Sequence, residues 1–286
     1  MISRHELERI VHDALDEDAP WGDLTSEALI PADAVATATL AAREPGVFAG
    51  GAAFAAAFRL TDPTIQVREL AADGTRFAAG ERLGEVRGPA RAVLTAERVG
   101  LNLAQRMSGI ATLTAAHVAA VTGTNARVTD TRKTTPGLRA LERDAVRAGG
   151  GHNHRRTLSD AVLVKDNHLA VLLERGLSVT DALLAARARL PHTTHLEVEV
   201  DRLDQIEAVL AAGVDTIMLD NFSLADLRAG VAQVAGRALV EASGGVSLET
   251  IGAIAETGVD LISVGALTHS ARALDLGLDI RVAADG

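Results

Sequence analysis

Cysteine and tyrosine are absent from the 286 residues, and the chain has only one tryptophan and five phenylalanines. Without cysteine, disulfides, thiolate metal sites and a cysteine nucleophile are excluded. With so few aromatic side chains, stacking on nucleic-acid bases is excluded as a main mode of recognition. An aromatic ligand would have to be held by charges, amides and aliphatic walls.

The chain also lacks a positive charge balance and a long apolar run. Its formal net charge is -10, which is unsuited to sequence-independent binding of a phosphate backbone. No apolar stretch approaches the ~18 residues that span a bilayer, and the first residues, MISRHELERIVHDALDED, are too charged for a signal peptide. We therefore expect a cytoplasmic protein that binds neither nucleic acid nor membranes.

The N-terminal part has the pattern of a small α/β domain. Ser3 and Glu6 have the spacing of a capping box at the start of an amphipathic helix. Short strands are expected after it, with a helix between them and a long helix at the end. We predict a small α+β unit over 1–108, to which the C-terminal segment 272–286 returns as a strand at 276–282. The elements expected inside it are strands at 35–42, 46–50 and 65–70 and helices at 51–60 and 91–107.

The following part repeats a simpler unit, an apolar strand followed by a helix rich in alanine and leucine. Six such units are too few for an eight-unit barrel, which takes ~250 residues. We predict an incomplete, about six-stranded TIM-like α/β barrel over 109–271, with an open doubly wound sheet as the alternative. The strands centre on Val128, Leu163, Val198, Ile217, Leu239 and Ile262, with helices at 138–148, 179–190, 203–211, 224–234 and 248–256.

The predicted strands end in charged or very small residues. Parallel α/β folds carry their chemistry at the carboxyl ends of the strands, so these residues are expected to form one site. Small residues after the last two strands would let main-chain amides approach a phosphate. The strand-end residues are Asp130, Arg132 and Lys133; Lys165 and Asp166; Glu197 and Glu199; Asp220 and Asn221; Glu241, Ser243, Gly244 and Gly245; and Gly265 and Ala266.

The segment 131–169 is rich in cations although the chain is acidic, which indicates a pocket for a small ligand with several negative charges. Arg139, Arg143 and Arg147 are spaced by four on a predicted helix and are expected to form a solvated face. Two plainer interpretations stay open at this point. Glu197 and Glu199 would then be an edge-strand pair, and His152 and His154 a chance metal-ligand spacing.

Several long motifs, in order along the chain, resemble the quinolinate phosphoribosyltransferase family. The resemblance implies an N-terminal α/β sandwich joined to an incomplete α/β barrel. The N-terminal motifs are GDLTSEAL at 22–29 and ERVGLNLAQRMSGIAT at 97–112. The others are TRKTTPGLR at 131–139, GGGHNHR at 149–155, LVKDNH at 163–168, EVEVD at 197–201, IMLDN at 217–221, EASGGV at 241–246 and SVGALTHS at 263–270.

The resemblance also implies an activity and an assembly. The reaction would join quinolinate and phosphoribosyl pyrophosphate to give nicotinate mononucleotide, pyrophosphate and carbon dioxide, with Mg2+ required, as a step of NAD biosynthesis. The protein would be a homodimer or a higher oligomer, a hexamer included. Each site would be completed by Arg98 of the partner subunit.

By the same resemblance, site roles can be carried over to residues of this sequence. Quinolinate carboxylates would bind Arg98, Arg132, His154 and Arg155, with Thr131 in the same substrate-binding loop. Lys133 and Lys165 would bind phosphate oxygens. Glu199 and Asp220 would meet the ribose hydroxyls and, directly or through water, Mg2+; the catalytic candidates are these two carboxylates and the two lysines. The main-chain amides of Ser243, Gly244, Gly245, Val264, Gly265 and Ala266 would hold the sugar phosphate.

Three other functions are weighed against this one. The first is a paralogue of the same fold associated with molybdenum transport. The second is a barrel lyase that uses Lys165 as a Schiff-base nucleophile. The third is a protein that binds phosphoribosyl ligands without turnover. The complete set of carboxylate-facing cations favours quinolinate.

Overall fold

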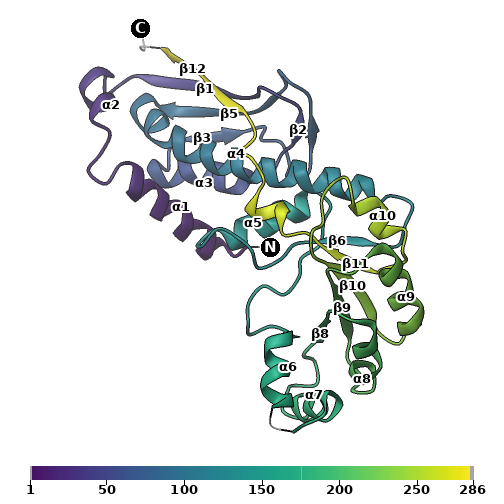
Figure 1. The fold of residues 1–286 in the computed structure, drawn as a ribbon. Coiled ribbons are helices and arrows are strands. Elements are labelled where there is room, and N and C mark those ends of the chain that lie inside the picture. Colours follow the sequence, from purple (N-terminus) through teal and green to yellow (C-terminus); the bar gives the residue numbers. More distant parts are fainter. Residues whose placement is uncertain (1, 175, 284–286) are drawn as a thin grey trace. The chain divides into compact units, whose positions relative to one another are not determined.

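The structure is a computed structural model that describes residues 2–174 and 176–283 (Figure 1). The chain forms two compact units, which we describe separately. The first comprises Met1–Ala115, Thr134–Gly150 and Leu267–Gly286, and the second Ala116–Lys133 and Gly151–Ala266. This contact-based division assigns the segment 134–150 to the first unit, whereas the boundary predicted from the sequence lies at 108/109.

An antiparallel sheet organises the first unit. β1 (Val35–Ala42) pairs with β12 (Leu276–Ala283) on one side and β5 (Arg82–Pro89) on the other, and β3 (Gln66–Arg68) continues from β5. β2 (Gly46–Val47) and β4 (Arg76–Phe77) form a separate short ribbon. The strand expected at 46–50 is therefore only two residues long, and β4 and β5 were not predicted.

Helices and buried rings complete the first unit. α1 (Arg4–Asp18) begins at Ser3, whose side chain accepts a hydrogen bond from the amide of Glu6, as the capping box predicts. α2 (Leu24–Leu29) occupies a stretch that the sequence pattern did not assign to a helix. α3 (Gly51–Thr61) contributes Phe54 and Phe58, whose rings are fully buried with centroids 4.9 Å apart. Such aromatic pairs stabilise a core beyond the area that they bury.

The long helix α4 (Ala90–Ala120) extends well past the predicted end at 107 and runs from the first unit into the second. Ser108 and Thr114 lie in the part of the helix that was not predicted. Both side chains are fully buried, and their hydroxyls donate to the main-chain oxygens of Ala49 and Ile110. Hydroxyl groups that find such partners are tolerated inside a helix.

The second unit is built on six parallel strands in the order β6-β11-β10-β9-β8-β7. Each strand from β7 to β11 lies beside the next one along the chain, which is the winding of a barrel and not of a doubly wound sheet. The predicted incomplete α/β barrel is thus confirmed. The strands are β6 (Arg127–Thr129), β7 (Val162–Val164), β8 (Leu196–Val200), β9 (Thr216–Asp220), β10 (Leu239–Ser243) and β11 (Leu261–Ser263).

Helices follow the strands of this unit (Figure 1). α9 (Leu224–Val234) has the predicted bounds, α10 (Ile251–Ala255) is shorter than expected, and α6 (Asp166–Leu173) was not predicted. The stretch expected as one helix at 203–211 is a short 3-10 turn, η1 (Leu203–Gln205), and then α8 (Ile206–Leu210). The remaining helices are α7 (Val179–Arg187) here and α5 (Arg139–Ala148) and α11 (Ala266–His269) elsewhere in the chain. No helix of the described residues is long and apolar enough to cross a membrane.

The two faces of the barrel sheet differ in chemistry. The register pairs Glu199 of β8 with Met218 of β9, and Glu241 of β10 with the same Met218. Because side chains alternate along a strand, one face carries the carboxylates and the other is apolar. The apolar face packs against helices, since a Cβ at Gly230 of α9 would lie 2.7 Å from Leu219. The carboxylate face therefore lines the interior of the barrel.

Two minor interpretations of the sequence are wrong. β8 lies between β7 and β9, so Glu197 and Glu199 are not an edge-strand pair. Arg139 and Arg143 are half-buried on α5, and Arg139 donates to the hydroxyl of Thr134, so that of the three only Arg147 is exposed.

Candidate active site

Lys165 and Glu199 form an ion pair at the carboxyl ends of β7 and β8. The register pairs Val164 with Val198, which places the next residue of β7 beside Glu199. The ammonium of Lys165 contacts a carboxylate oxygen of Glu199, and the two side chains are 45% and 13% exposed. This pair is accessible from solvent on the lysine side and is suited to a charged ligand.

Asp220 is the last residue of β9 and is half-buried. By the register and the alternation of side chains, it lies on the same face of the sheet as Glu199. Its Oδ2 accepts a hydrogen bond of 2.7 Å from the side-chain amide of Asn221. Two carboxylates on one face of neighbouring strands offer the hard oxygen ligands that Mg2+ prefers.

A buried cluster of one histidine and two glutamates lies in the interior of the barrel. The Nε2 of His154 is 2.9 Å from Oε2 of Glu197 and 3.6 Å from Oε1 of Glu241. The glutamate side chains are 4% and 1% exposed. Oε1 of each glutamate has no hydrogen-bond partner among the residues that the structure describes.

The electrostatics of this cluster follow from its burial. Desolvation, together with the neighbouring charge of Glu197, raises the pKa of Glu241 to about 8. Burial disfavours the charged form of His154, but the carboxylates of Glu197, Glu241 and Asp130 outweigh it and raise the pKa of the ring.

The residues at the end of β6 fix the segment that carries His154. The main chain of His152 bridges to Thr129 of β6, and its carbonyl accepts from the amide of Asp130. Asp130 is fully buried and accepts hydrogen bonds from the main-chain amide of His154 at 2.8 Å and the side-chain amide of Asn153 at 2.6 Å. The segment that carries His154 is therefore fixed to the barrel by a buried carboxylate.

Arg155 and Arg132 bring two positive charges close to each other. Burial and the charge of Arg132 together lower the pKa of the Arg155 guanidinium. Arg155 is half-buried, and its Nη1 donates to the carbonyl of Ala161 at 3.1 Å. Two guanidinium groups that repel each other form a site that an anion would stabilise.

The glycines after β10 adopt conformations that favour glycine. Gly244 and Gly245 have φ values of 94° and 59°. A Cβ at Gly244 would lie 2.2 Å from Oδ1 of Asn221, which itself has a φ of 58°. Gly244 is thus required for packing against Asn221, which is a second reason for a small residue besides the approach of a phosphate.

The predicted phosphate amides need one correction. The amide of Val264 donates to the carbonyl of Thr129 at 2.9 Å, as part of the pairing between β11 and β6. It therefore does not point to a ligand, because an amide has a single hydrogen to donate. Its use in the sheet is a tertiary contact, and no pattern in the sequence predicts it.

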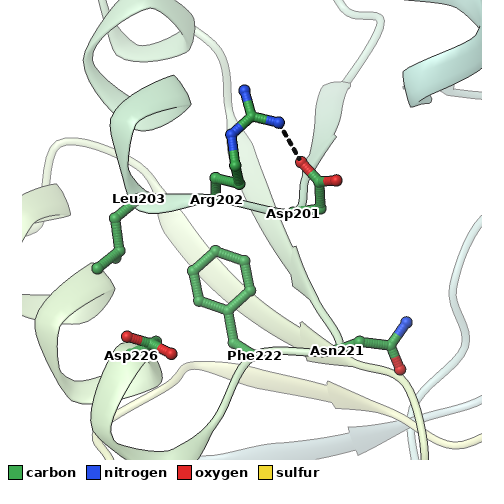
Figure 2. Close-up of a pocket in the computed structure, with 6 residues that line it drawn as sticks. All are labelled: Asp201, Arg202, Leu203, Asn221, Phe222 and Asp226. Atoms are coloured by element: carbon green, nitrogen blue, oxygen red, sulfur yellow. Dashed lines mark hydrogen bonds and ion pairs between the residues drawn. The ribbon is translucent and has the colours of Figure 1, made fainter.

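A separate pocket of about 250 Å3 lies at the carboxyl ends of β8 and β9 (Figure 2). Figure 2 shows the ring of Phe222 at its centre and the ion pair between Asp201 and Arg202 at its edge, 3.4 Å long. Of the strand-end residues predicted to form the site, Asn221 lines this pocket. The lining residues are Asp201, Arg202, Leu203, Asn221, Phe222 and Asp226.

Nearly all of the predicted site residues belong to the second unit. Arg98 is the exception, because it is exposed on the part of α4 that belongs to the first unit; its role in the site of a partner subunit stays a prediction. Asp130, Glu197 and Glu241 were expected at strand ends, but their grouping around His154 was not predicted; Asp130 directly follows β6, and the two glutamates lie within β8 and β10. The residues in the second unit are Thr131, Arg132, Lys133, His154, Arg155, Lys165, Glu199, Asp220, Ser243, Gly244, Gly245, Val264, Gly265 and Ala266.

An incomplete α/β barrel with cations and carboxylates at the carboxyl ends of its strands defines a barrel enzyme that acts on anionic substrates. Comparison with known proteins identifies the family to which this barrel enzyme belongs. The family profile described as quinolinate phosphoribosyl transferase, C-terminal domain, matches residues 110–279, and the N-terminal domain of the same family matches residues 23–108. The chain belongs to the quinolinate phosphoribosyl transferase family.

Individual relatives agree with this assignment. Nicotinate-nucleotide pyrophosphorylase [carboxylating] of Mycobacterium leprae is 49% identical over 276 residues, which are 93% of this chain and 94% of the relative. A probable enzyme of the same name from Bacillus subtilis is 41% identical, over 96% and 93% of the two chains. The crystal structure of NadC from Streptococcus pyogenes superposes with a TM-score of 0.94 at 40% identity, over 99% of each chain.

Proposed function

We propose that this chain transfers the phosphoribosyl group of phosphoribosyl pyrophosphate to quinolinate, with loss of carbon dioxide, to give nicotinate mononucleotide and pyrophosphate. It is a carboxylating nicotinate-nucleotide pyrophosphorylase by this proposal, a pentosyltransferase of NAD biosynthesis. Membership of the family and the names of the relatives support the reaction. One observation carries the proposal. The barrel unit contains two arginines close enough to affect each other's charge, Arg132 and Arg155, and also the ion pair between Lys165 and Glu199.

Quinolinate has two adjacent carboxylates, which suit Arg132 and Arg155. A planar guanidinium can bind a carboxylate through two parallel hydrogen bonds, so it fixes both the position and the plane of the ligand. The mutual repulsion of the two arginines is relieved when a dianion lies between them. This explains how an aromatic ring is bound in a chain with almost no aromatic side chains.

Phosphoribosyl pyrophosphate would lie over the ends of the neighbouring strands. Lys133 and Lys165 supply point charges for phosphate oxygens, and the amides after β10 face the sugar phosphate. Glu199 and Asp220 fit Mg2+ by their oxygen donors and their common face of the sheet. The ion would neutralise the charge of the departing pyrophosphate when bound.

The chemistry needs orientation and charge more than proton transfer. Positive charge develops at C1 and the ring oxygen of the ribose as pyrophosphate leaves, and the fixed carboxylates of Glu199 and Asp220 stabilise it. The quinolinate nitrogen, held in place by the arginines, attacks C1. The positively charged ring nitrogen stabilises the electron pair that is left on the neighbouring ring carbon when the adjacent carboxylate departs as carbon dioxide, and this carbon then takes up a proton from water to give nicotinate mononucleotide.

The activity is tested by the formation of nicotinate mononucleotide from quinolinate, phosphoribosyl pyrophosphate and Mg2+, with nicotinate as the control substrate. Turnover of quinolinate alone is expected, and turnover of nicotinate instead would refute the proposal. Arg132→Ala should abolish quinolinate binding in calorimetry, whereas Arg228→Ala, an exposed arginine of α9, should leave it unchanged. Equal binding by the two variants would refute the role of Arg132.

We further propose a homodimer or higher oligomer in which Arg98 completes the site of the partner subunit. Its exposure on α4 leaves the guanidinium accessible. Mixing inactive Arg98→Ala and Lys165→Ala chains should restore part of the activity, because one of the mixed sites then has both residues intact. No recovery after proven subunit exchange would refute the shared site. A cytoplasmic location stays a prediction of the sequence.

A further inference from the structure

Asp130 joins the two segments that carry the arginines of the proposed quinolinate site. β6 pairs with the segment 151–155 as a parallel bridge between Thr129 and His152, and the amide of Asp130 donates to the carbonyl of His152 at 3.1 Å. One step further along, the carboxylate of Asp130 continues this pairing, since its Oδ1 accepts from the main-chain amide of His154 at 2.8 Å. Beyond this contact both segments continue as loops.

Each arginine lies directly after this contact. Arg132 follows Asp130 by two residues, and Arg155 follows His154 by one. Burial and the charge of Arg132 lower the pKa of Arg155, so the two guanidinium groups are close to each other. Like charges move apart unless the main chain that carries them is fixed. The hydrogen bond between Asp130 and His154 is therefore in a position to determine how far apart the two arginines lie.

We propose that Asp130 is a positioning residue whose carboxylate fixes the separation of Arg132 and Arg155, and that it thereby selects ligands with two adjacent carboxylates. The inference rests on the proposed function and adds a residue to it. Asp130 has no exposed surface from which to contact a ligand. It acts through the main chain of His154 and leaves the ring of this histidine to the role predicted for it.

The burial of Asp130 is costly, which argues for a role of this kind. A carboxylate that is taken out of water destabilises a protein unless hydrogen bonds compensate. Here Oδ2 accepts from the side-chain amide of Asn153 at 2.6 Å, in addition to the bond from His154 to Oδ1. An apolar residue after β6 would avoid the desolvation, but it could not hold a main-chain amide.

A purely structural role is the competing interpretation, and Asp260 provides the comparison. The Oδ2 of Asp260 accepts from the main-chain amide of Val240 at 2.8 Å, in the same unit. Asp260 directly precedes β11, so it lies at the amino end of the parallel strands, whereas Asp130 directly follows β6 at their carboxyl end. The two carboxylates thus make the same kind of bond, and only one of them lies near the proposed site.

The first test measures quinolinate binding by calorimetry. Misplacement of a binding group by an ångström can cost on the order of a hundredfold, so Asp130→Ala should weaken binding by at least about tenfold. Asp130→Asn keeps an oxygen for the His154 amide and should lose less than about fivefold. Asp260→Ala should bind as the wild type does. Misfolded chains lower the stoichiometry and leave the Kd of the folded fraction unchanged, so a structural role would not reproduce this pattern.

Three results of this test contradict the proposal. The first is an unchanged Kd in Asp130→Ala. The second is an equal loss in Asp130→Ala and Asp130→Asn, because the charge and not the acceptor would then matter. The third is an equal loss in Asp260→Ala. If Asp130→Ala does not fold, Asn153→Ala takes its place, since it removes one of the two contacts of the carboxylate; a Kd equal to that of the wild type would then overturn the proposal.

The second test measures selectivity with lutidinate, a pyridine dicarboxylate whose two carboxylates are not on adjacent ring carbons. The wild type should prefer quinolinate, and Asp130→Ala should lose most of this preference, because the two arginines no longer match adjacent carboxylates. A preference as strong as that of the wild type would refute the control of their separation.

The third measurement needs no ligand and separates this proposal from the proposed function. Hydrogen–deuterium exchange of peptides that span 150–158 should be faster in Asp130→Ala than in the wild type and in Asp130→Asn. Equal exchange in all three proteins would show that Asp130 does not fix this segment. If the wild type bound no quinolinate, the proposed function would fail, and the exchange would still decide whether Asp130 holds the segment that carries Arg155.

Discussion

Arg106 and Glu142 form a buried ion pair of the first unit, and removing the arginine is expected to destabilise this unit strongly. Glu142 has no exposed side-chain surface, and its Oε1 accepts from Nη2 of Arg106 at 2.9 Å. The hydroxyl and amide of Thr135 also donate to Glu142, at 2.8 and 3.1 Å. Arg106 further donates to the main-chain oxygens of Thr268 and Ala271. The side chain of Arg106, on α4, thus contacts both α5 and the segment that leads to β12.

The magnitude follows from the burial of Glu142. Arg106→Met would leave a buried carboxylate without its cation, which costs about 3–5 kcal/mol of the free energy of unfolding. Arg82→Met is the matched control, because Arg82 pairs with Glu69 at 2.8 Å while the two side chains are 47% and 74% exposed. An exposed pair of this kind contributes about 0–1 kcal/mol.

Urea unfolding followed by far-UV circular dichroism measures the difference. Fluorescence is a poor probe here, because the only tryptophan, Trp21, is 93% exposed in the folded protein. The double variant Arg106→Met/Glu142→Met should be more stable than Arg106→Met alone, since it removes the unpaired charge. The reasoning is refuted if Arg106→Met and Arg82→Met lose equal stability, or if the double variant is the least stable of the three.

Three further predictions concern single positions. Gly109→Ala should lower the melting temperature by several degrees, because its Cβ would lie 1.8 Å from the carbonyl oxygen of Arg272, a main-chain atom that cannot move alone; an unchanged melting temperature would contradict this packing. Gly244→Ala should cost about 1–3 kcal/mol in urea unfolding, since it combines a φ of 94° with a 2.2 Å approach to Asn221, whereas Gly80→Ala, with a φ of 84° and open space around it, should cost less. Because the pKa of Glu241 is raised to about 8, the free energy of unfolding should fall as the pH rises from about 4.5 to about 8, since the folded protein keeps a proton that the unfolded chain has lost. Glu241→Gln should show a smaller decline of the urea midpoint over this range. An equal decline in the two proteins would contradict the raised pKa of Glu241.

The barrel was predictable because its strands are apolar on the helix-facing side and end in charged residues. β8 shows this in five residues, with Val198 and Val200 on one face and Glu197 and Glu199 on the other. The same alternation did not show which of the two glutamates reaches solvent. Glu199 pairs with the accessible Lys165, whereas Glu197, two residues earlier, lies deeper and meets His154.

The sequence could not show which hydrogen-bond partners the polar groups have in the folded protein. The amide of Val264 looks available in a glycine-rich segment, but the pairing of β11 with β6 uses it. The long helix was predicted to end at 107, but it continues through Ser108, whose buried hydroxyl donates a hydrogen bond to the main-chain oxygen of Ala49. Both errors have the same physical cause, because whether a polar group is satisfied depends on residues far away in the sequence.

The carboxylates of the barrel differ in how deeply they are buried, and this difference determines which partners they can have. Glu199 and Asp220 are partly accessible, and Glu199 pairs with the accessible Lys165, so this carboxylate can exchange its partner when a charged substrate binds. Glu197 and Glu241 are closed off from solvent, where burial favours the protonated form of Glu241 and Glu197 contacts the ring of His154. A charged substrate is therefore expected to change the partners of Glu199 and to leave those of Glu197 and Glu241 unchanged.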